Sequence, residues 1–201
     1  MSTALDARAA RVWDRICAYF KRYENSGIGQ LAAPAAMPAL DRLAEPLGLA
    51  LPEEMRSLYR VHDGGFARLL PEGAWFRSVD EIASVWPTFA QLADDDFSEL
   101  PAELVVENTH WDAPYHRGWV PFATRDDFDI WIDLVPGPNG TSGQVLYPVG
   151  EASVIVVAND VLAFLERWAA ILESDLVEWR EEYSYPLPRD GKRVLDLLRA
   201  E

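Results

Sequence analysis

The sequence contains few of the residues that disulfide bonding or membrane insertion would require. It has one cysteine, Cys17, among its 201 residues. One cysteine cannot form an internal disulfide, which is typical of a reducing compartment. Cys17 falls on the apolar side of a predicted helix, so we expect a small buried side chain rather than a reactive thiol. No apolar run approaches the roughly 20 residues that cross a bilayer, and residues 1–15 lack the apolar stretch of a signal peptide. We therefore expect a cytoplasmic protein.

Positive charge is also scarce. The chain has 18 Lys and Arg against 33 Asp and Glu, a formal net charge of -15. Nucleic-acid phosphates and anionic membranes repel such a chain, so we expect no direct binding to either. Between Asp80 and Asp133, 13 acidic residues face two basic ones, which places -11 of the -15 in about a quarter of the chain. This concentration favours a basic protein as the partner.

Motifs for metal, nucleotide or nucleophilic chemistry are missing as well. The three histidines do not stand at metal-ligand spacing: His62, His110 and His116. The acidic run 94–96 lacks the alternating oxygen ligands and central glycine of a calcium loop. No Gly-x-Ser-x-Gly elbow is present, and the glycine-rich run 136–143 is not followed by the Lys-Ser/Thr pair of a phosphate loop. We expect no metal and no cofactor.

Paired carboxylates are the one catalytic arrangement that the sequence leaves open. Asp129 and Asp133 stand four residues apart on a predicted strand, so they share a face and lie about 13 Å apart. The two carboxylates of a glycosidase lie closer together than that. A charged solvent face is the favoured interpretation, but pairing across strands could bring other carboxylates together. A carboxylate-dependent hydrolase therefore stays as an alternative.

The first half of the chain has the apolar spacing of helices. We predict helices over 4–25, over 37–47, from Pro52 to the glycines at 64–65, and over 79–92. Pro52 fits a first helical turn because its missing N–H has no partner there. Ser78 and Glu81 form a capping box for the fourth helix. The acidic run 94–96 is expected to end that helix in a solvated loop.

The second half changes to the period of strands. We predict strands over 119–124, 128–134, 145–149 and 154–158, the first two joined as an antiparallel hairpin. A last core helix covers 161–172, with Asn159 or Asp160 as its N-cap. Helices, then strands, then a helix indicate a single α+β domain. The expected organisation is an N-terminal helix in 1–30, the α+β domain in 31–174, and a tail in 175–201 that packs back on the domain and carries a short helix near 194–198.

The strand over 128–134 alternates apolar residues with Asp129, Trp131 and Asp133. An aromatic side chain among acids is a suitable anchor for a basic partner. The opposite interpretation, that a helix or the tail covers Trp131, is weighed equally. With the neighbouring acids, the predicted partner-binding surface comprises Asp94, Asp95, Asp96, Asp126, Asp127, Asp129, Trp131 and Asp133.

Three ordered segments resemble the SUKH superfamily, and within it the domain of the fungal cell-wall-synthesis regulators: 51–65 (LPEEMRSLYRVHDGG), 119–123 (WVPFA) and 132–145 (IDLVPGPNGTSGQV). The match covers about residues 37–168. The resemblance implies an α+β fold with a mixed, bent sheet flanked by helices, and binding modules without a catalytic centre. The shared positions are expected to be structural: Pro52, Gly64, Gly65, Trp119, Pro121, Asp133, Gly143 and Gln144.

Many bacterial members of the superfamily are immunity proteins that neutralise polymorphic toxins, and the fungal relatives are regulatory scaffolds. We therefore expect a non-catalytic immunity protein whose acidic face binds a basic toxin domain such as a nuclease, because acidic surfaces complement basic substrate grooves. The alternatives are a housekeeping regulatory or scaffold protein without a toxin partner, and the carboxylate-dependent hydrolase.

Overall fold

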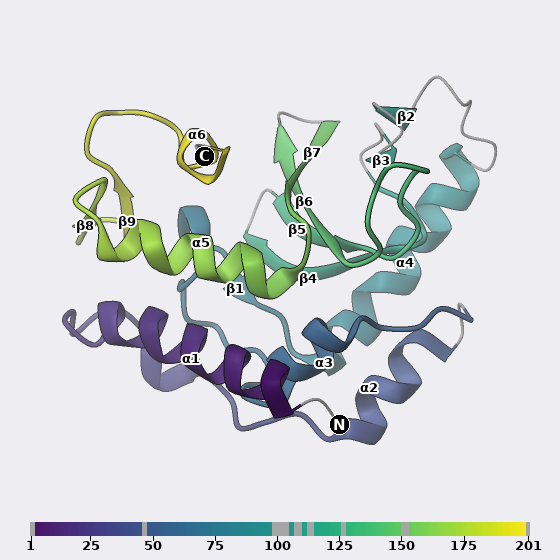
Figure 1. Cartoon of the computed structure of the whole chain (residues 1–201), viewed down its shortest axis with the longest axis horizontal. Coiled ribbons are helices and arrows are strands. Elements are labelled where there is room, and N and C mark those ends of the chain that lie inside the picture. Colours follow the sequence, from purple (N-terminus) through teal and green to yellow (C-terminus); the bar gives the residue numbers. More distant parts are fainter. Residues whose placement is uncertain are drawn as a thin grey trace.

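The structure is a computed structural model that describes residues 3–45, 48–97, 105–106, 110–111, 115–125, 128–149 and 153–199 (Figure 1). The α-helices are α1 (Thr3–Phe20), α2 (Met37–Ala44), α3 (Glu53–Tyr59), α4 (Val79–Phe97), α5 (Val161–Glu173) and α6 (Val194–Arg199). The strands are β1 (Trp75–Phe76), β2 (Val105–Val106), β3 (His110–Trp111), β4 (Trp119–Arg125), β5 (Phe128–Asp133), β6 (Gln144–Val149), β7 (Ser153–Ala158), β8 (Val177–Arg180) and β9 (Tyr185–Pro188). The α+β class is confirmed.

The central sheet has five strands in the order β1-β4-β5-β6-β7. Each neighbouring pair in it is antiparallel, so the mixed sheet that the resemblance implied is wrong in this detail. The reason lies in the connections. The strands from β4 to β7 follow one another through short links, and short links join antiparallel neighbours, whereas parallel neighbours need a long crossover.

Helices cover both faces of this sheet. Figure 1 shows α5, with α1 beneath it, on one side of the strands and α4 on the other. The first face carries Phe122 and Ile132 into the main core, which α1 and α5 complete. The second face carries Trp119 and Trp131 into a smaller apolar cluster, against which Phe89 of α4 packs. Neither face of β4 and β5 is therefore a free solvent face.

The N-terminal helix α1 ends at Phe20, five residues before its predicted end, and buries Val12, Trp13, Ile16 and Phe20. Cys17 is buried as expected, and burial raises the pKa of its thiol. Tyr23 lies beyond the helix and stacks on Trp179, with ring centroids 4.4 Å apart. The predicted packing face was therefore correct, while the last turn was overestimated.

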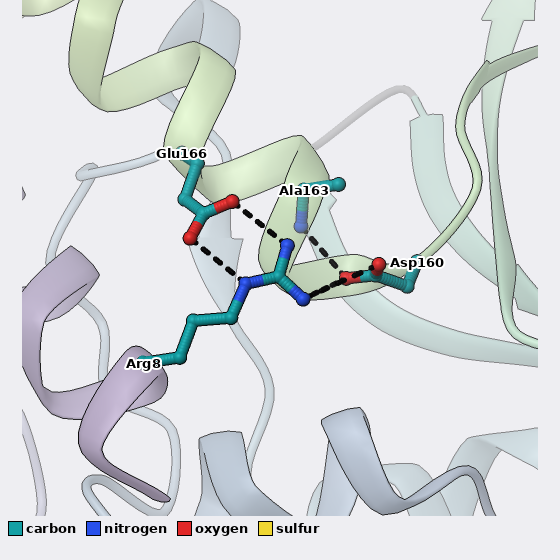
Figure 2. A network of polar contacts seen from close by, with 4 residues as sticks. All are labelled: Arg8, Asp160, Ala163 and Glu166. Carbon is teal, nitrogen blue, oxygen red and sulfur yellow. Dashed lines mark hydrogen bonds and ion pairs between the residues drawn. The ribbon is translucent and has the colours of Figure 1, made fainter. Parts of the chain in front are cut away.

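Charged groups attach α1 to the start of α5, as Figure 2 shows. The Arg8 guanidinium donates two hydrogen bonds to Glu166, at 2.8 and 2.7 Å. It also pairs with Asp160 at 3.4 Å. Asp160 is the N-cap of α5 and accepts the Ala163 N–H at 2.7 Å, which confirms one of the two predicted caps. Arg8 therefore joins the N-terminal helix to the cap of the core helix.

The capping box of α4 is confirmed, because the Ser78 N–H donates to the Glu81 carboxylate at 2.7 Å and the Glu81 N–H donates to Ser78 Oγ at 3.2 Å. The helix then continues to Phe97 and includes the acidic run 94–96. The predicted loop at this run is wrong. The buried residues Trp86, Ala90 and Ala93 keep the helical spacing up to the start of the run, so the helix is packed on the core as far as Ala93.

The C-terminal segment contains a β-hairpin that was not predicted, because its prolines are unfavourable in most strands. Strands β8 and β9 pair as a two-stranded sheet, with Pro186 opposite Trp179 and Pro188 opposite Val177. Alternate residues of a strand direct their N–H groups to the same edge, so both missing donors fall on one edge and the pairing survives. The predicted short helix is confirmed as α6, and its buried leucines pack the segment back on the domain.

Candidate protein-interaction site

The structure buries the aromatic residue that the sequence placed on a binding face. Trp131 is 4% exposed. Its ring lies 4.8 Å from that of Phe89, at an interplanar angle of 82°, and 6.2 Å from that of Trp119. The prediction that Trp131 is a surface anchor is wrong, because α4 covers this face of the sheet. The alternative interpretation, coverage by a helix, is the one observed.

Asp129 and Asp133 also differ from exposed surface acids. Asp129 is half-buried and accepts a hydrogen bond from Arg77 at 2.5 Å, with both side chains less than 15% exposed. Asp133 is fully buried. Each carboxylate has its own partner inside the protein, so neither is available to a binding partner as a free charge.

Asp133 organises the loop that links β5 to β6. Its carboxylate accepts the Val135 N–H at 2.9 Å and the Gln144 side-chain amide at 2.8 Å. Its carbonyl accepts the Gly143 N–H at 2.7 Å. The oxygen of the same Gln144 amide accepts the Thr141 N–H at 3.1 Å. Burial raises the pKa of Asp133 to about 6, and the bonds from Gln144 and Val135 lower it only in part. Such a network holds a loop in one conformation and needs no ligand.

Two glycines explain why the motif segments lie together. Gly143 has a φ of +95°, and a Cβ atom there would lie 3.0 Å from Cγ of Pro52. Gly64 has a φ of +77°, and a Cβ atom there would lie 2.3 Å from the backbone N of Ser78. The loop before β6 thus packs on the start of α3 through Gly143. The end of the motif segment 51–65, at Gly64, packs on the start of α4. This geometry supports the structural role expected for the shared positions.

The remaining motif residues are also part of the framework. Gly65 has a φ of +142°, and a Cβ atom there would lie 2.5 Å from the carbonyl oxygen of Gln30. Trp119 is fully buried in the smaller apolar cluster. Pro121 stands where the register of β4 against β5 shifts by one residue. A proline is tolerated at such an irregularity because a ladder hydrogen bond is already missing there.

The other predicted surface acids fall in two places. Asp126 and Asp127 lie outside the described residues. Asp94, Asp95 and Asp96 lie within α4. In the part of the chain that the structure describes, no three His, Cys, Asp or Glu side chains gather as metal ligands. Likewise, none of the described helices combines the length and apolar character needed to cross a bilayer.

Within the described part of the chain, a groove between α2 and α4 has a shape suited to binding. The two helices lie side by side (Figure 1) and enclose a hollow of about 230 Å³. The α2 wall is formed by Ala39, Arg42 and Leu43. The α4 wall is formed by Val79, Asp80, Ala83, Trp86, Pro87 and Ala90. Ligand pockets for drug-sized molecules usually measure about 300–1,000 Å³, so this hollow better fits a few side chains of a protein partner.

The floor of the groove is fixed, and its rim is open. Leu43, Val79 and Trp86 are buried, and the Trp86 indole donates a hydrogen bond to the Arg117 carbonyl at 3.0 Å. Ala83 and Pro87 of the α4 wall are exposed. Side chains that are already buried in the free protein lose little further freedom when a partner binds, which lowers the entropic cost of association.

Charge surrounds the groove unevenly. Asp80 and Arg42 line opposite walls, and both are exposed. The α4 sequence itself carries five acidic residues and no Lys or Arg. Of these acids only Asp80 lines the groove, so the α4 wall carries one negative charge, in its first turn, which favours partners that bring a basic group there.

Sequence reasoning predicted both helices of the groove but not their pairing. One signal was present. Ala83, Pro87 and Ala90 recur at helical spacing on α4, so one stripe of an otherwise acid-rich helix is small and uncharged. Such a stripe indicates a face that another element approaches closely. Which element approaches is a question of tertiary structure, and helical periodicity does not answer it.

Comparison with known proteins gives a consistent result. A sequence model described as "SMI1 / KNR4 family (SUKH-1)" matches residues 34–167. A Schizosaccharomyces pombe protein named "Cell wall biosynthesis/cell cycle regulator smi1" is 26% identical over 98% of this chain and 44% of its own length. "KNR4/SMI1 homolog 2" of Debaryomyces hansenii is 26% identical over 81% of this chain and 35% of its own length.

The chain thus spans less than half of either relative. The matched region contains the central sheet, α5 up to Arg167, and both walls of the groove. Helix α1, the β8–β9 hairpin and α6 lie outside it but bury their side chains in the same core. The match covers well over half of the sequence, and it includes the three segments that carry the resemblance, so the chain belongs to the SMI1 / KNR4 family (SUKH-1).

Proposed function

We propose that this chain is a non-catalytic protein-binding module with a regulatory role, and that it binds its partners through the α2–α4 groove. The observation that carries the proposal is the groove itself, a mainly apolar hollow with a buried floor and one acidic residue, Asp80, on its α4 wall. One of the two relatives is named as a regulator of cell wall biosynthesis and the cell cycle, and the other as a KNR4/SMI1 homologue, which supports the regulatory role. Both walls lie within the region that matches the family.

The arrangement of carboxylates supports a binding role over hydrolysis. A carboxylate-dependent hydrolase needs two acids that converge on one bond. Among the described residues, the leading pair does not converge, because Asp129 is bound by Arg77 and Asp133 is bound by Gln144. The raised pKa of Asp133 results from burial in the sheet and not from a position in an open cleft.

Neutralisation of a basic toxin is the second candidate. One observation favours it, namely the net charge of -11 between Asp80 and Asp133, since an acidic inhibitor suits a basic nuclease groove. The names of the relatives favour the regulatory role instead. The two candidates use the same kind of surface and differ in the partner, so the identity of the partner decides between them.

The test compares three versions of the full chain in the cells from which it comes: the wild type, Ala83→Trp and Ser84→Trp. Both positions are exposed on α4, but only Ala83 lines the groove. A tryptophan at position 83 fills the hollow, and one at position 84 is a matched control for an added aromatic surface. Partners are crosslinked, captured and quantified by mass spectrometry, and circular dichroism verifies the fold of each variant.

We expect a set of partners that A83W loses and S84W retains. Endogenous proteins with regulatory roles in that set support the main proposal. A basic toxin in that set, together with rescue of toxin-expressing cells by the wild type and not by A83W, supports the second candidate. If all three versions capture the same proteins in the same amounts, the groove is not the binding site and the proposal fails.

A further inference from the structure

The residues that line the α2–α4 groove indicate the shape and the charge of the partner that would fit it. Helix α4 contributes residues from Val79 to Ala90, so the groove extends along about three helical turns, or roughly 15 Å. Three of its wall residues are alanines, Ala39, Ala83 and Ala90. Small side chains on two neighbouring helices let a third backbone approach closely.

A proline marks the middle of the α4 wall. Pro87 stands inside the helix and cannot donate the hydrogen bond that the Ala83 carbonyl accepts in a regular helix. Both residues line the groove and are exposed. The proline ring takes the place of that donor and adds apolar surface to the middle of the wall.

One end of the α4 wall is charged and its middle is not. Asp80 and Glu81 lie in the first turn of α4, whereas the acidic run 94–96 lies beyond the residues that line the groove. The stretch from Ile82 to Ala93 has neither acidic nor basic side chains. Arg42 gives the α2 wall one positive charge. The complementary partner is therefore apolar in its centre and basic toward the first turn of α4.

Resting on the proposed function, we infer that the occupant of this groove is an amphipathic helix of a partner protein, with a basic residue directed at Asp80. Its apolar face presents side chains at i, i+3, i+4 and i+7, which is the spacing that a groove between two helices accepts. An acidic residue on the opposite side of the occupant meets Arg42.

An extended segment fits these features less well. A strand presents alternate residues about 7 Å apart and needs backbone partners along its length. The walls of this groove are helices, whose backbone groups are already bonded except near Pro87. A free small molecule is disfavoured by the size of the hollow, about 230 Å³.

The probe is a displayed library of fully randomised 16-residue peptides, selected on the wild-type chain and counter-selected on A83W. Because the library contains helical, extended and proline-rich sequences, the enriched pattern reports the conformation that the groove accepts. We expect apolar residues at i, i+3 or i+4 and i+7, with lysine or arginine at one end. Binders synthesised from this set should lose more than tenfold in affinity for A83W and less than twofold for S84W.

Charge reversal tests the orientation. Asp80→Lys should weaken these binders about two- to fivefold, the usual range for an exposed ion pair. Asp14→Lys makes the same change of net charge at an exposed site on α1, outside the groove, and should leave the affinity unchanged. If D14K weakens binding as much as D80K does, the charge acts through net charge alone and the orientation is refuted.

The outcomes distinguish an error in the helical occupant from an error in the groove as the binding site. Enrichment of alternating or proline-rich sequences that still depend on position 83 refutes the helical occupant and leaves the groove as the binding site. Enrichment of acidic sequences refutes the basic partner. If no sequence depends on position 83 and cellular capture is also unaffected by A83W, both the inference and the proposed function fail.

Discussion

Asp133→Asn provides the sharpest test of how the core network is held. Burial raises the pKa of Asp133 to about 6 from its ordinary value of 3.8. The folded state therefore retains a proton at Asp133 at pH values where the unfolded chain has already released it. At pH values between these two pKa values, the folded protein binds more protons than the unfolded protein. The free energy of unfolding therefore falls as the pH rises through this range.

The magnitude follows from the shift. A difference of about two pKa units corresponds to roughly 3 kcal/mol over the full titration, of which about 2 kcal/mol appears between pH 7 and pH 4. Asparagine has nearly the same shape but does not titrate. The difference between the unfolding free energies of wild type and D133N should therefore change by about 2 kcal/mol in favour of the wild type as the pH falls from 7 to 4.

The assay is urea unfolding followed by far-ultraviolet circular dichroism at each half unit of pH. Glu166→Gln is the control of opposite sign, because the hydrogen bonds from Arg8 lower the pKa of Glu166, and the stability they provide is lost as the pH falls. If the D133N difference stays constant from pH 7 to pH 4, the bonds from Gln144 and Val135 fully offset burial, and the reasoning is refuted. A shift in favour of D133N at low pH would refute it more strongly.

Two further substitutions test the framework. Gly143→Ala should destabilise the fold by about 1–3 kcal/mol, because alanine is strained at a φ of +95° and its Cβ atom would lie 3.0 Å from Pro52. Urea unfolding measures this loss of stability. A loss below about 0.5 kcal/mol would mean that the loop moves away from Pro52 without strain. Arg8→Ala should cost about 1 kcal/mol, the upper end for a partly exposed pair, by releasing α1 from Glu166 and Asp160. Thermal unfolding should show a decrease of about 2–4 °C. Arg11→Ala, exposed on the same helix and acting on Glu166 only through charge attraction, should lower the melting temperature by less than about 1 °C.

Local chemistry made much of the fold predictable from sequence. A capping box needs only Ser78 and Glu81 at the right spacing, and an N-cap needs only Asp160 before an apolar helix, so both were found without any tertiary information. The strand β5 was found because apolar residues alternate in it with Asp129, Trp131 and Asp133, and β4 because it is a short run rich in apolar residues. These features depend on residues within a few positions of one another.

Features that depend on distant residues were missed for a common reason. Alternation along β5 correctly placed Trp131 on the face opposite Ile132, but it could not show that Phe89 of α4 would cover that face. Likewise, Pro186 and Pro188 were interpreted as breaks in regular structure. A strand accepts them only when their edge faces away from the paired strand, and the sequence does not show which edge of β9 faces β8. The groove required knowing that α2 packs beside α4.

The acid-rich segment illustrates how burial changes the meaning of a charge count. Its acids include Asp133, which is buried and held by neutral donors, and Asp129, which is bound by an arginine. Asp80 is exposed beside the groove and remains available to a partner. An exposed pair contributes only about 0.2–1 kcal/mol, so charge at Asp80 cannot supply most of the affinity. Burial of apolar side chains in the α2–α4 groove has to supply it, while the negative wall selects which partners approach and in which orientation.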